Sequence, residues 1–195
     1  MNKHLKVLDL GAGPWKHYSY AISLDWNPKS NPDIIWDLNK FPYPFEDNEF
    51  DIVYACHILE HLDNPIKVLE EIWRILKPNG KLVLKTPHFS CRTAYGNPEH
   101  KHYFSSLLFD YFEREKDFIA KTNAKFIVEK IKLVWSPPEP KSMRDSQKKF
   151  QPLIKILNSF FSFFANINID FCERFWCYFV GGFAEIQFEV RTVKG

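Results

Sequence analysis

Short apolar runs alternate with polar, turn-forming segments along the first half of the chain. Five of these runs have strand character, and several are apolar on both faces, as strands buried in a parallel sheet are. They lie at Lys6–Leu10, Ala21–Asp25, Asp33–Trp36, Asp51–Ala55 and Lys81–Lys85. Only about ten residues separate the first two runs, and a crossover with its helix usually needs at least ~10–12. We therefore expect the first helix to be vestigial or replaced by a loop.

Two helices are predicted, one before and one after the last of these strands. Apolar residues recur with the helical period over Pro65–Leu76, where Asp63 or Asn64 can cap the first turn. The segment Pro78-Asn79-Gly80 stops this helix. A second helix is expected over about Ser105–Ile119.

The last third of the chain combines two strands with an aromatic-rich helical insertion. Phe126–Trp135 and Ala184–Val193 have strand character, and the insertion occupies about residues 137–183 between them. It opens with a proline-rich polar loop that ends near Lys149.

The helix that follows this loop is amphipathic. Its apolar face carries Leu153, Ile156, Leu157, Phe160, Phe163, Phe164 and Ile167. Its polar face carries Lys155, Asn158, Ser159, Ser162 and Asn166. We expect the apolar stripe to be buried on the sheet edge. The alternatives are a lid over an apolar acceptor, peripheral contact with a membrane, and a homodimer contact.

Length and composition narrow the class of protein. The 195 residues suit a single domain, 1–195, and the net charge of +2 gives no reason to expect a nucleic-acid partner. The four cysteines lack paired CxxC spacing and no secretory leader is recognisable, so a reduced, cytoplasmic protein is expected. No apolar run reaches the ~18–20 residues that span a bilayer.

Candidate chemistry begins at the end of the first strand. Asp9 precedes the loop Gly11-Ala12-Gly13, and Asp25 ends the next strand. Glycines let backbone approach a ligand closely, and a carboxylate at the second strand can bind a ribose diol. The simpler interpretation is a turn and a capping carboxylate. Pro14-Trp15-Lys16 replaces the third glycine of the dinucleotide fingerprint, which disfavours a nicotinamide oxidoreductase.

An ordered series of segments resembles the class I methyltransferases that use S-adenosylmethionine. The segments are Val7-Leu8-Asp9-Leu10-Gly11-Ala12-Gly13, Ser23-Leu24-Asp25-Trp26, Asp37-Leu38, Phe41-Pro42-Tyr43-Pro44-Phe45, Phe50-Asp51-Ile52-Val53-Tyr54, His57-Ile58-Leu59-Glu60-His61-Leu62 and Leu76-Lys77-Pro78-Asn79-Gly80-Lys81-Leu82. The resemblance covers about Val7 to Phe118 and, more weakly, the last two strands. It implies a Rossmann-like α/β/α sandwich with a mostly parallel seven-stranded sheet and a C-terminal antiparallel strand pair.

The same resemblance implies roles for individual cofactor-binding residues. Gly11, Ala12 and Gly13 would pass against the methionine part of S-adenosylmethionine, and Asp9 would orient that turn. Asp25 would accept hydrogen bonds from both ribose hydroxyls.

The remaining roles concern the adenine and the transferred methyl group. Trp26 would lie against the adenine ring. Asp37 would accept from the adenine amino group, and Leu38 would present its backbone N–H to a ring nitrogen. His57 would sit near the sulfonium and the opening to the acceptor.

The chain after the fifth strand offers candidates for a general base. His88 and His100 lie in loops that would overhang the transferring methyl group, and histidine titrates close to neutral pH. The alternative is that they cap the loop and the next helix. We expect no metal: neither the set of His88, His100 and His102 nor the pair His57 and His61 matches a strong metal signature.

These observations predict S-adenosylmethionine-dependent methyl transfer to an oxygen or nitrogen. The acceptor would be a small molecule, a sugar or a lipid-linked compound. The alternative is a non-catalytic cofactor-binding module that acts as a scaffold through its aromatic insertion.

Overall fold

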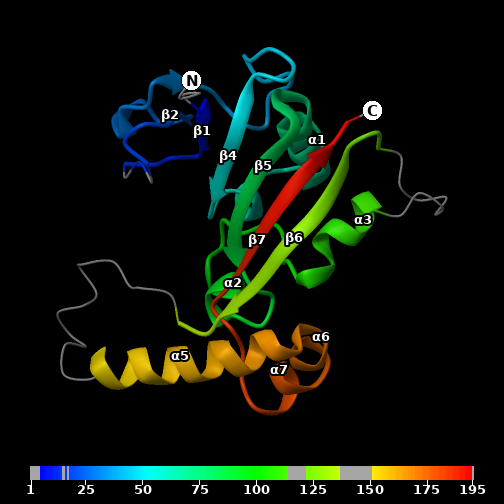
Figure 1. Cartoon of the computed structure of the whole chain (residues 1–195). Coiled ribbons are helices and arrows are strands. Elements are labelled where there is room, and N and C mark those ends of the chain that lie inside the picture. The colour runs from blue at the N-terminus through cyan, green and yellow to red at the C-terminus, as the bar shows by residue number, and fades with distance from the viewer. Residues whose placement is uncertain (1–4, 15, 17, 114–121, 137–150, 195) are drawn as a thin grey trace.

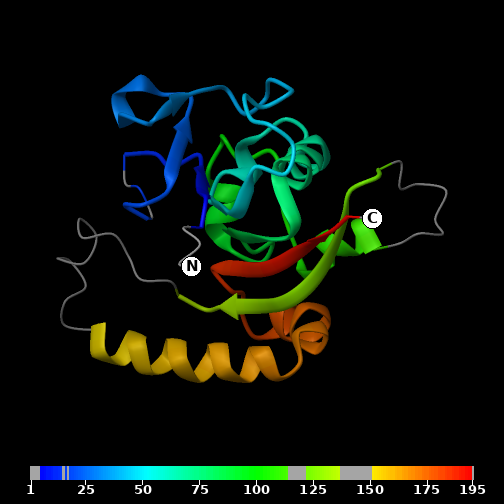
Figure 2. The same ribbon diagram turned by 45° about the horizontal axis from the view of Figure 1, so that its top comes forward.

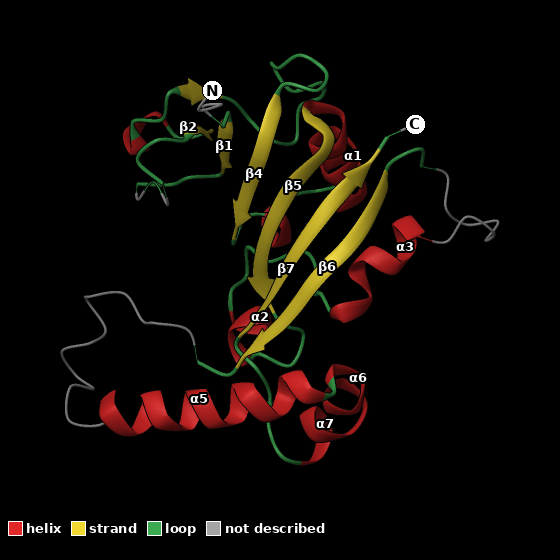
Figure 3. Ribbon diagram, in the orientation of Figure 1, coloured by secondary structure: helices red, strands yellow, loops and turns green. Residues whose placement is uncertain are grey.

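Seven strands form one mixed sheet in the order β3-β2-β1-β4-β5-β7-β6 (Figures 1 and 3). The computed structural model describes residues 5–14, 16, 18–113, 122–136 and 151–194. The strands are β1 Val7–Leu10, β2 Ile22–Asp25, β3 Ile34–Ile35, β4 Phe50–Cys56, β5 Leu76–Pro87, β6 Lys125–Val134 and β7 Glu185–Val193. Strands β1 to β5 are parallel, and β7 runs antiparallel to both β5 and β6. The predicted α/β fold class, with its antiparallel C-terminal pair, is confirmed.

The burial of β1 agrees with its interior position in the sheet. All four of its residues are buried, and it pairs with β2 on one side and β4 on the other. Its side chains therefore face protein on both sides, as the doubly apolar run predicts. The described residues between β1 and β2 form turns and no helix, which agrees with the short spacing of the two strands.

The helix α1, Pro65–Ile75, carries the chain from β4 to β5. Asn64 caps it by accepting a hydrogen bond from the Lys67 N–H. Its buried face packs on the sheet core through Val68, Leu69, Ile72 and Ile75. The helix ends one residue before the predicted Leu76, because Leu76 is already extended and pairs with Phe50.

Short helical segments connect β5 to β6. They are α2 Arg92–Gly96, a 3-10 turn Ser106–Phe109 and α3 Asp110–Glu113, which lies against β6 (Figure 1). Ser105 caps the 3-10 turn, as expected for the start of the predicted helix. Residues 114–119 of that predicted helix lie outside the described residues.

The insertion between β6 and β7 is helical over its described part. It consists of α5 Gln151–Ile167, α6 Ile169–Phe171, a π-helical turn Cys172–Trp176 and α7 Cys177–Phe179. Helix α5 lies beside β6 (Figure 2). The predicted loop at 137–149 lies outside the described residues. Among the residues that are described, no helix is long and apolar enough to cross a membrane.

The prediction that α5 buries its apolar stripe on the sheet edge is wrong. Every member of the stripe except half-buried Leu157 is exposed; Phe163, for example, is 65% exposed. The polar face is turned toward the sheet instead, where Asn158, Ser162 and Asn166 bind backbone groups at the end of β6. Unsatisfied backbone groups of an edge strand therefore decide the orientation of the helix.

Candidate active site

The loop after β1 depends on two glycines with left-handed backbone. Gly11 has a φ of +66° and Gly13 a φ of +58°, a region that other residues seldom adopt. The Gly11 N–H donates to the Leu24 carbonyl at 2.8 Å. A Cβ at Gly11 would lie 2.5 Å from Cγ1 of Ile58. Only glycine fits at this position without displacing the segment after β4.

Asp25 fixes this loop from the end of β2. Its Oδ2 accepts from the Gly13 N–H at 2.9 Å and its Oδ1 from the Asn27 N–H at 2.8 Å. Each carboxylate oxygen has a second lone pair that these bonds leave free. The side chain is only 7% exposed, and its open side faces the crevice between the strand ends.

That crevice is a cavity of about 580 Å³ at the carboxyl ends of β1, β2 and β3. Its lining includes five of the predicted cofactor-binding residues: Gly11, Asp25, Trp26, Asp37 and Leu38. The volume lies within the range of small-molecule sites. Trp26 is 70% exposed, so its ring is available to a planar ligand.

The other predicted cofactor residues lie next to the cavity but are not among its lining residues. Asp9 is fully buried in β1, and Ala12 is buried with its N–H directed at the Leu24 carbonyl, 3.3 Å away. Gly13 has open space where a Cβ would be. His57 follows the last residue of β4.

The segment that carries Asp37 and Leu38 is held by α1. Asp37 closes a short turn by accepting from the Asn39 N–H at 3.0 Å. Buried Tyr43 donates its hydroxyl to the Leu38 carbonyl at 3.1 Å. The Tyr43 N–H donates to Glu71 of α1 at 2.7 Å. This wall of the cavity is therefore organised before any ligand arrives.

His57 forms an ion-paired group with two buried carboxylates. Its Nε2 lies 2.6 Å from Oε2 of Glu185, and its Nδ1 lies 3.5 Å from Oε1 of Glu60. Burial alone would lower the pKa of His57, but the bonds to Glu185 and Glu60 outweigh it and raise the pKa to about 9. Burial likewise favours neutral Glu185, yet the bond to His57 keeps its pKa below the ordinary value. His57 is therefore a cation at neutral pH.

Sequence reasoning missed Glu185 as a partner of the site. It is 128 positions from His57 and is brought there by the antiparallel pairing of β7 with β5. The acidic residue at the start of the last strand was the only signal in the sequence, and nothing local connects it with His57.

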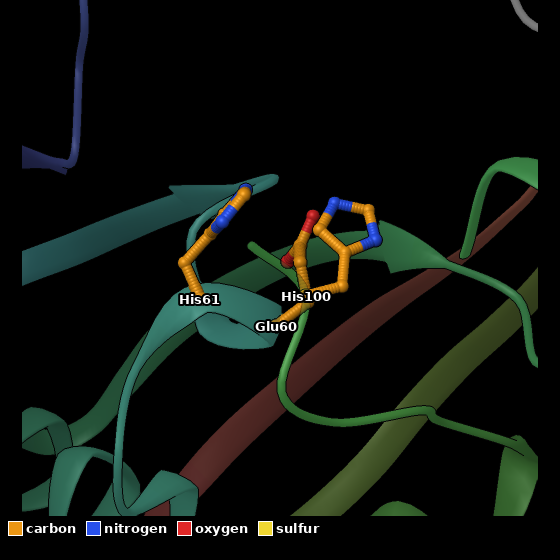
Figure 4. Close-up of side chains that lie close together, drawn as sticks. All are labelled: Glu60, His61 and His100. Carbon is orange, nitrogen blue, oxygen red and sulfur yellow. The ribbon is translucent and has the colours of Figure 1, made fainter. Parts of the chain in front are cut away.

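The side chains of Glu60, His61 and His100 lie close together (Figure 4). His61 lines the cavity and donates its Nδ1–H to the Glu99 carbonyl at 3.2 Å. His100 donates its Nδ1–H to the Ala94 carbonyl at 2.9 Å. These bonds leave each Nε2 with a lone pair. One ligand atom from each of the three side chains lies within 4.8 Å of the others, so this cluster could hold a metal ion.

His88 has a different environment from His100. It is fully buried, with Nδ1 2.6 Å from Oγ of Ser90 and Nε2 2.9 Å from Oε1 of Glu173. Burial favours neutral Glu173, but its bonds to His88 and Ser106 keep its pKa below the ordinary value. Both ring nitrogens are occupied, so the geometry favours a structural role for His88 over the expected role as a base.

Comparisons with known proteins point to a methyltransferase domain. A family model described as a methyltransferase domain matches residues 24–84. The sterol 4-C-methyltransferase of Caenorhabditis elegans is 49% identical over 41 residues, which are 21% of this chain and 12% of that protein. A ubiquinone/menaquinone biosynthesis C-methyltransferase of Desulfotalea psychrophila is 37% identical over 60 residues, 31% of this chain and 21% of that protein. The chain thus matches only a minor part of the length of these curated relatives.

Solved structures share the fold over nearly the whole chain. An S-adenosylmethionine-dependent methyltransferase from Archaeoglobus fulgidus has a TM-score of 0.55 at 15% identity, covering 96% of this chain and 86% of that one. Another, from Mesorhizobium loti, has a TM-score of 0.54 at 14% identity, covering 96% of this chain and 90% of that one. The chain therefore has the fold of the class I S-adenosylmethionine-dependent methyltransferases and matches a methyltransferase-domain model over residues 24–84, and this match implies S-adenosylmethionine as the methyl donor.

Proposed function

We propose that this chain transfers a methyl group from S-adenosylmethionine to an oxygen or nitrogen of a small-molecule, sugar or lipid-linked acceptor. The observation that supports this most is the single cavity that gathers Gly11, Asp25, Trp26, Asp37 and Leu38. The chemistry of the cavity suits the parts of that cofactor. One carboxylate suits the ribose hydroxyls, the other carboxylate and the exposed indole suit the adenine, and the backbone of the glycine loop suits the amino-acid part.

Each of these residues has a defined task in the proposal. Asp25 accepts from the ribose hydroxyls with the lone pairs that Gly13 and Asn27 leave free. Trp26 covers the adenine face, while Asp37 and the Leu38 N–H bind its edge. The group of His57, Glu60 and Glu185 carries one net negative charge when both carboxylates are ionised, which favours a cation nearby.

Little catalytic machinery is needed beyond alignment. The bound cofactor supplies an activated methyl group, and holding the acceptor in line contributes roughly 7–11 kcal/mol. A hydroxyl or ammonium acceptor must also lose its proton. We assign this task to His100, because its Nδ1–H is held by Ala94 and its Nε2 keeps a lone pair.

Carbon is the competing acceptor atom, since both curated relatives above are named as C-methyltransferases. Those matches are 41 and 60 residues long, and the family model ends at residue 84, before the loop that carries His100. The family match therefore bears on the cofactor-binding half of the chain more than on the acceptor.

Calorimetry with S-adenosylmethionine, S-adenosylhomocysteine and NAD tests cofactor use. We expect the first two ligands to bind and NAD not to bind. Mass spectrometry of a panel of hydroxyl and amine acceptors then tests turnover. Cofactor binding without any methylated product would support the non-catalytic scaffold instead.

A matched pair of variants tests His100. Replacement His100→Gln should lower kcat about 100-fold or more with cofactor affinity unchanged. His102→Gln changes a half-buried histidine of the same loop and should leave kcat near that of the native chain. Equal effects of the two replacements would contradict the role of His100 as the base.

A further inference from the structure

The inner face of α5 is joined to the edge of the sheet by hydrogen bonds. Asn166 accepts from the Leu133 N–H at 2.9 Å and donates to the Leu133 carbonyl at 2.8 Å. Ser162 accepts from the Trp135 N–H at 3.1 Å, and Asn158 from the Ser136 N–H at 2.9 Å. These bonds fix the rotation of the helix, so its apolar face is directed away from the protein.

The outer face of the insertion is a continuous series of exposed apolar side chains, here called the aromatic face. Its members are 49–74% exposed. They are Leu153, Ile156, Phe160, Phe163, Phe164, Ile167, Phe171, Phe175, Tyr178, Phe179 and Val180. Since a large aromatic side chain offers about 150–250 Å², the face exposes on the order of 1,000 Å². Soluble monomers seldom expose more than a few hundred Å² of contiguous apolar surface.

Positive charge borders this face on the side of Phe163 and Ile167. A groove of about 630 Å³ between β6 and α5 is lined by Lys130, Lys132 and Lys155, with no carboxylate among its lining residues. Within the part of the chain that is described, Lys132 and Lys155 have no salt-bridge partner, and Lys130 lies 3.5 Å from Glu189. Two of the three lysines come from β6, so the helix alone does not reveal this charge.

We propose that the helices α5 to α7 dock this protein onto a bilayer that contains anionic phospholipid. The aromatic face would lie at the boundary of headgroups and acyl chains, with the groove lysines against lipid phosphates. A second copy is less suitable as the occupant. A two-fold contact pairs a patch with itself, and each copy would bring the same unpaired lysines to its border.

Flotation of the full chain with vesicles tests the proposal. Phosphatidylcholine vesicles are compared with vesicles in which a quarter of the lipid is phosphatidylglycerol. We expect binding to the anionic vesicles that weakens as salt is added. The double variant Phe163→Ser/Phe164→Ser should have a partition coefficient about tenfold or more below that of the native chain. The matched control is the double variant Leu107→Ser/Ile127→Ser, which changes exposed apolar residues outside the aromatic face. It should bind the vesicles as the native chain does.

Charge is tested separately. The double variant Lys132→Glu/Lys155→Glu should bind anionic vesicles more weakly, by at least about fivefold for each lysine. The control double variant Lys29→Glu/Lys67→Glu should bind them as the native chain does. Equal loss in both lysine pairs, or no vesicle binding by the native chain, would overturn the proposal. Light scattering without lipid completes the test: a stable dimer that the two phenylalanine replacements dissociate would assign the aromatic face to a second copy.

Discussion

The cofactor crevice and the aromatic insertion both place polar side chains at the ends of strands, but they use them in opposite ways. In the crevice, Asp25 binds two backbone N–H groups and still faces an open cavity. In the insertion, Asn166 and Ser162 of α5 are turned inward onto β6, and the apolar side chains face outward. Polar residues point to a ligand in the first region and to the protein's own edge strand in the second.

The difference shows what an amphipathic pattern leaves open. Hydrophobic periodicity predicts that a helix has two faces, but it does not say which face meets the protein. An edge strand with unpaired backbone groups can bind the polar face more specifically than a covered sheet can bind the apolar one. The apolar face is then available to a partner of another kind.

One carboxylate–histidine contact ties the insertion to the sheet, and a second ties β7 to the end of β4. Glu173 of the insertion holds His88 after β5, and Glu185, the first residue of β7, holds His57 after β4. The insertion is therefore fastened to the same end of the sheet that carries the crevice.

The largest effect is expected from Asp25→Ala. The change removes the ribose acceptor and the anchor of the Gly13 N–H together. Affinity for S-adenosylmethionine should fall more than 100-fold in calorimetry, since several charge-assisted bonds are lost at once. Asp33→Ala is the control, because that carboxylate binds Ser23 and Lys16 and does not line the cavity. Unchanged affinity in Asp25→Ala would remove the basis of the cofactor site.

A pair of glycine replacements measures how far the crevice depends on backbone shape. Gly11→Ala combines a positive φ with a contact of 2.5 Å to Ile58, so we expect about 3 kcal/mol of destabilisation. Gly13→Ala meets open space and should cost about 1 kcal/mol from its φ alone. Chemical denaturation compares them. Equal losses would show that Ile58 moves aside easily.

Much of the fold and part of the site could be predicted because their signals are local. The apolar run of β1, the loop from Gly11 to Gly13 and the Asn64 cap each depend on a few neighbouring residues. Five predicted cofactor residues line one cavity because parallel strands end at the same edge of the sheet.

The contacts that could not be predicted join distant parts of the chain. Glu173 and Glu185 lie 85 and 128 positions from their histidines. The burial of His88 follows from the position of the insertion, which its own pattern does not determine. The rotation of α5 likewise depends on the free backbone groups of β6, so it requires the assembled sheet edge.

The two faces of α5 can be tested against each other. Asn166→Leu leaves the Leu133 N–H and carbonyl without their side-chain partner and should lower the free energy of unfolding by about 2 kcal/mol. Phe164→Ser on the aromatic face should change it by less than about 0.5 kcal/mol, because that side chain is 49% exposed. Urea denaturation gives both values. A larger loss in Phe164→Ser would mean that the outward face is buried in solution.

The contact between His57 and Glu185 predicts that the stability of the fold depends on pH. The folded chain binds the His57 proton more tightly than the unfolded chain, whose pKa is near 6.5. The contribution of protonated His57 to the stability of the fold is therefore fully present below pH 6.5 and is lost as the pH rises through about 9. Glu185→Gln should move the pKa of His57 back toward 6.5 in an NMR titration and remove that loss. Glu189→Gln, on the same strand but paired with Lys81, should leave the titration of His57 unchanged. If His57 still titrates near pH 9 in Glu185→Gln, then Glu185 is not what stabilises the imidazolium, and the ionic link between the ends of β4 and β7 is absent.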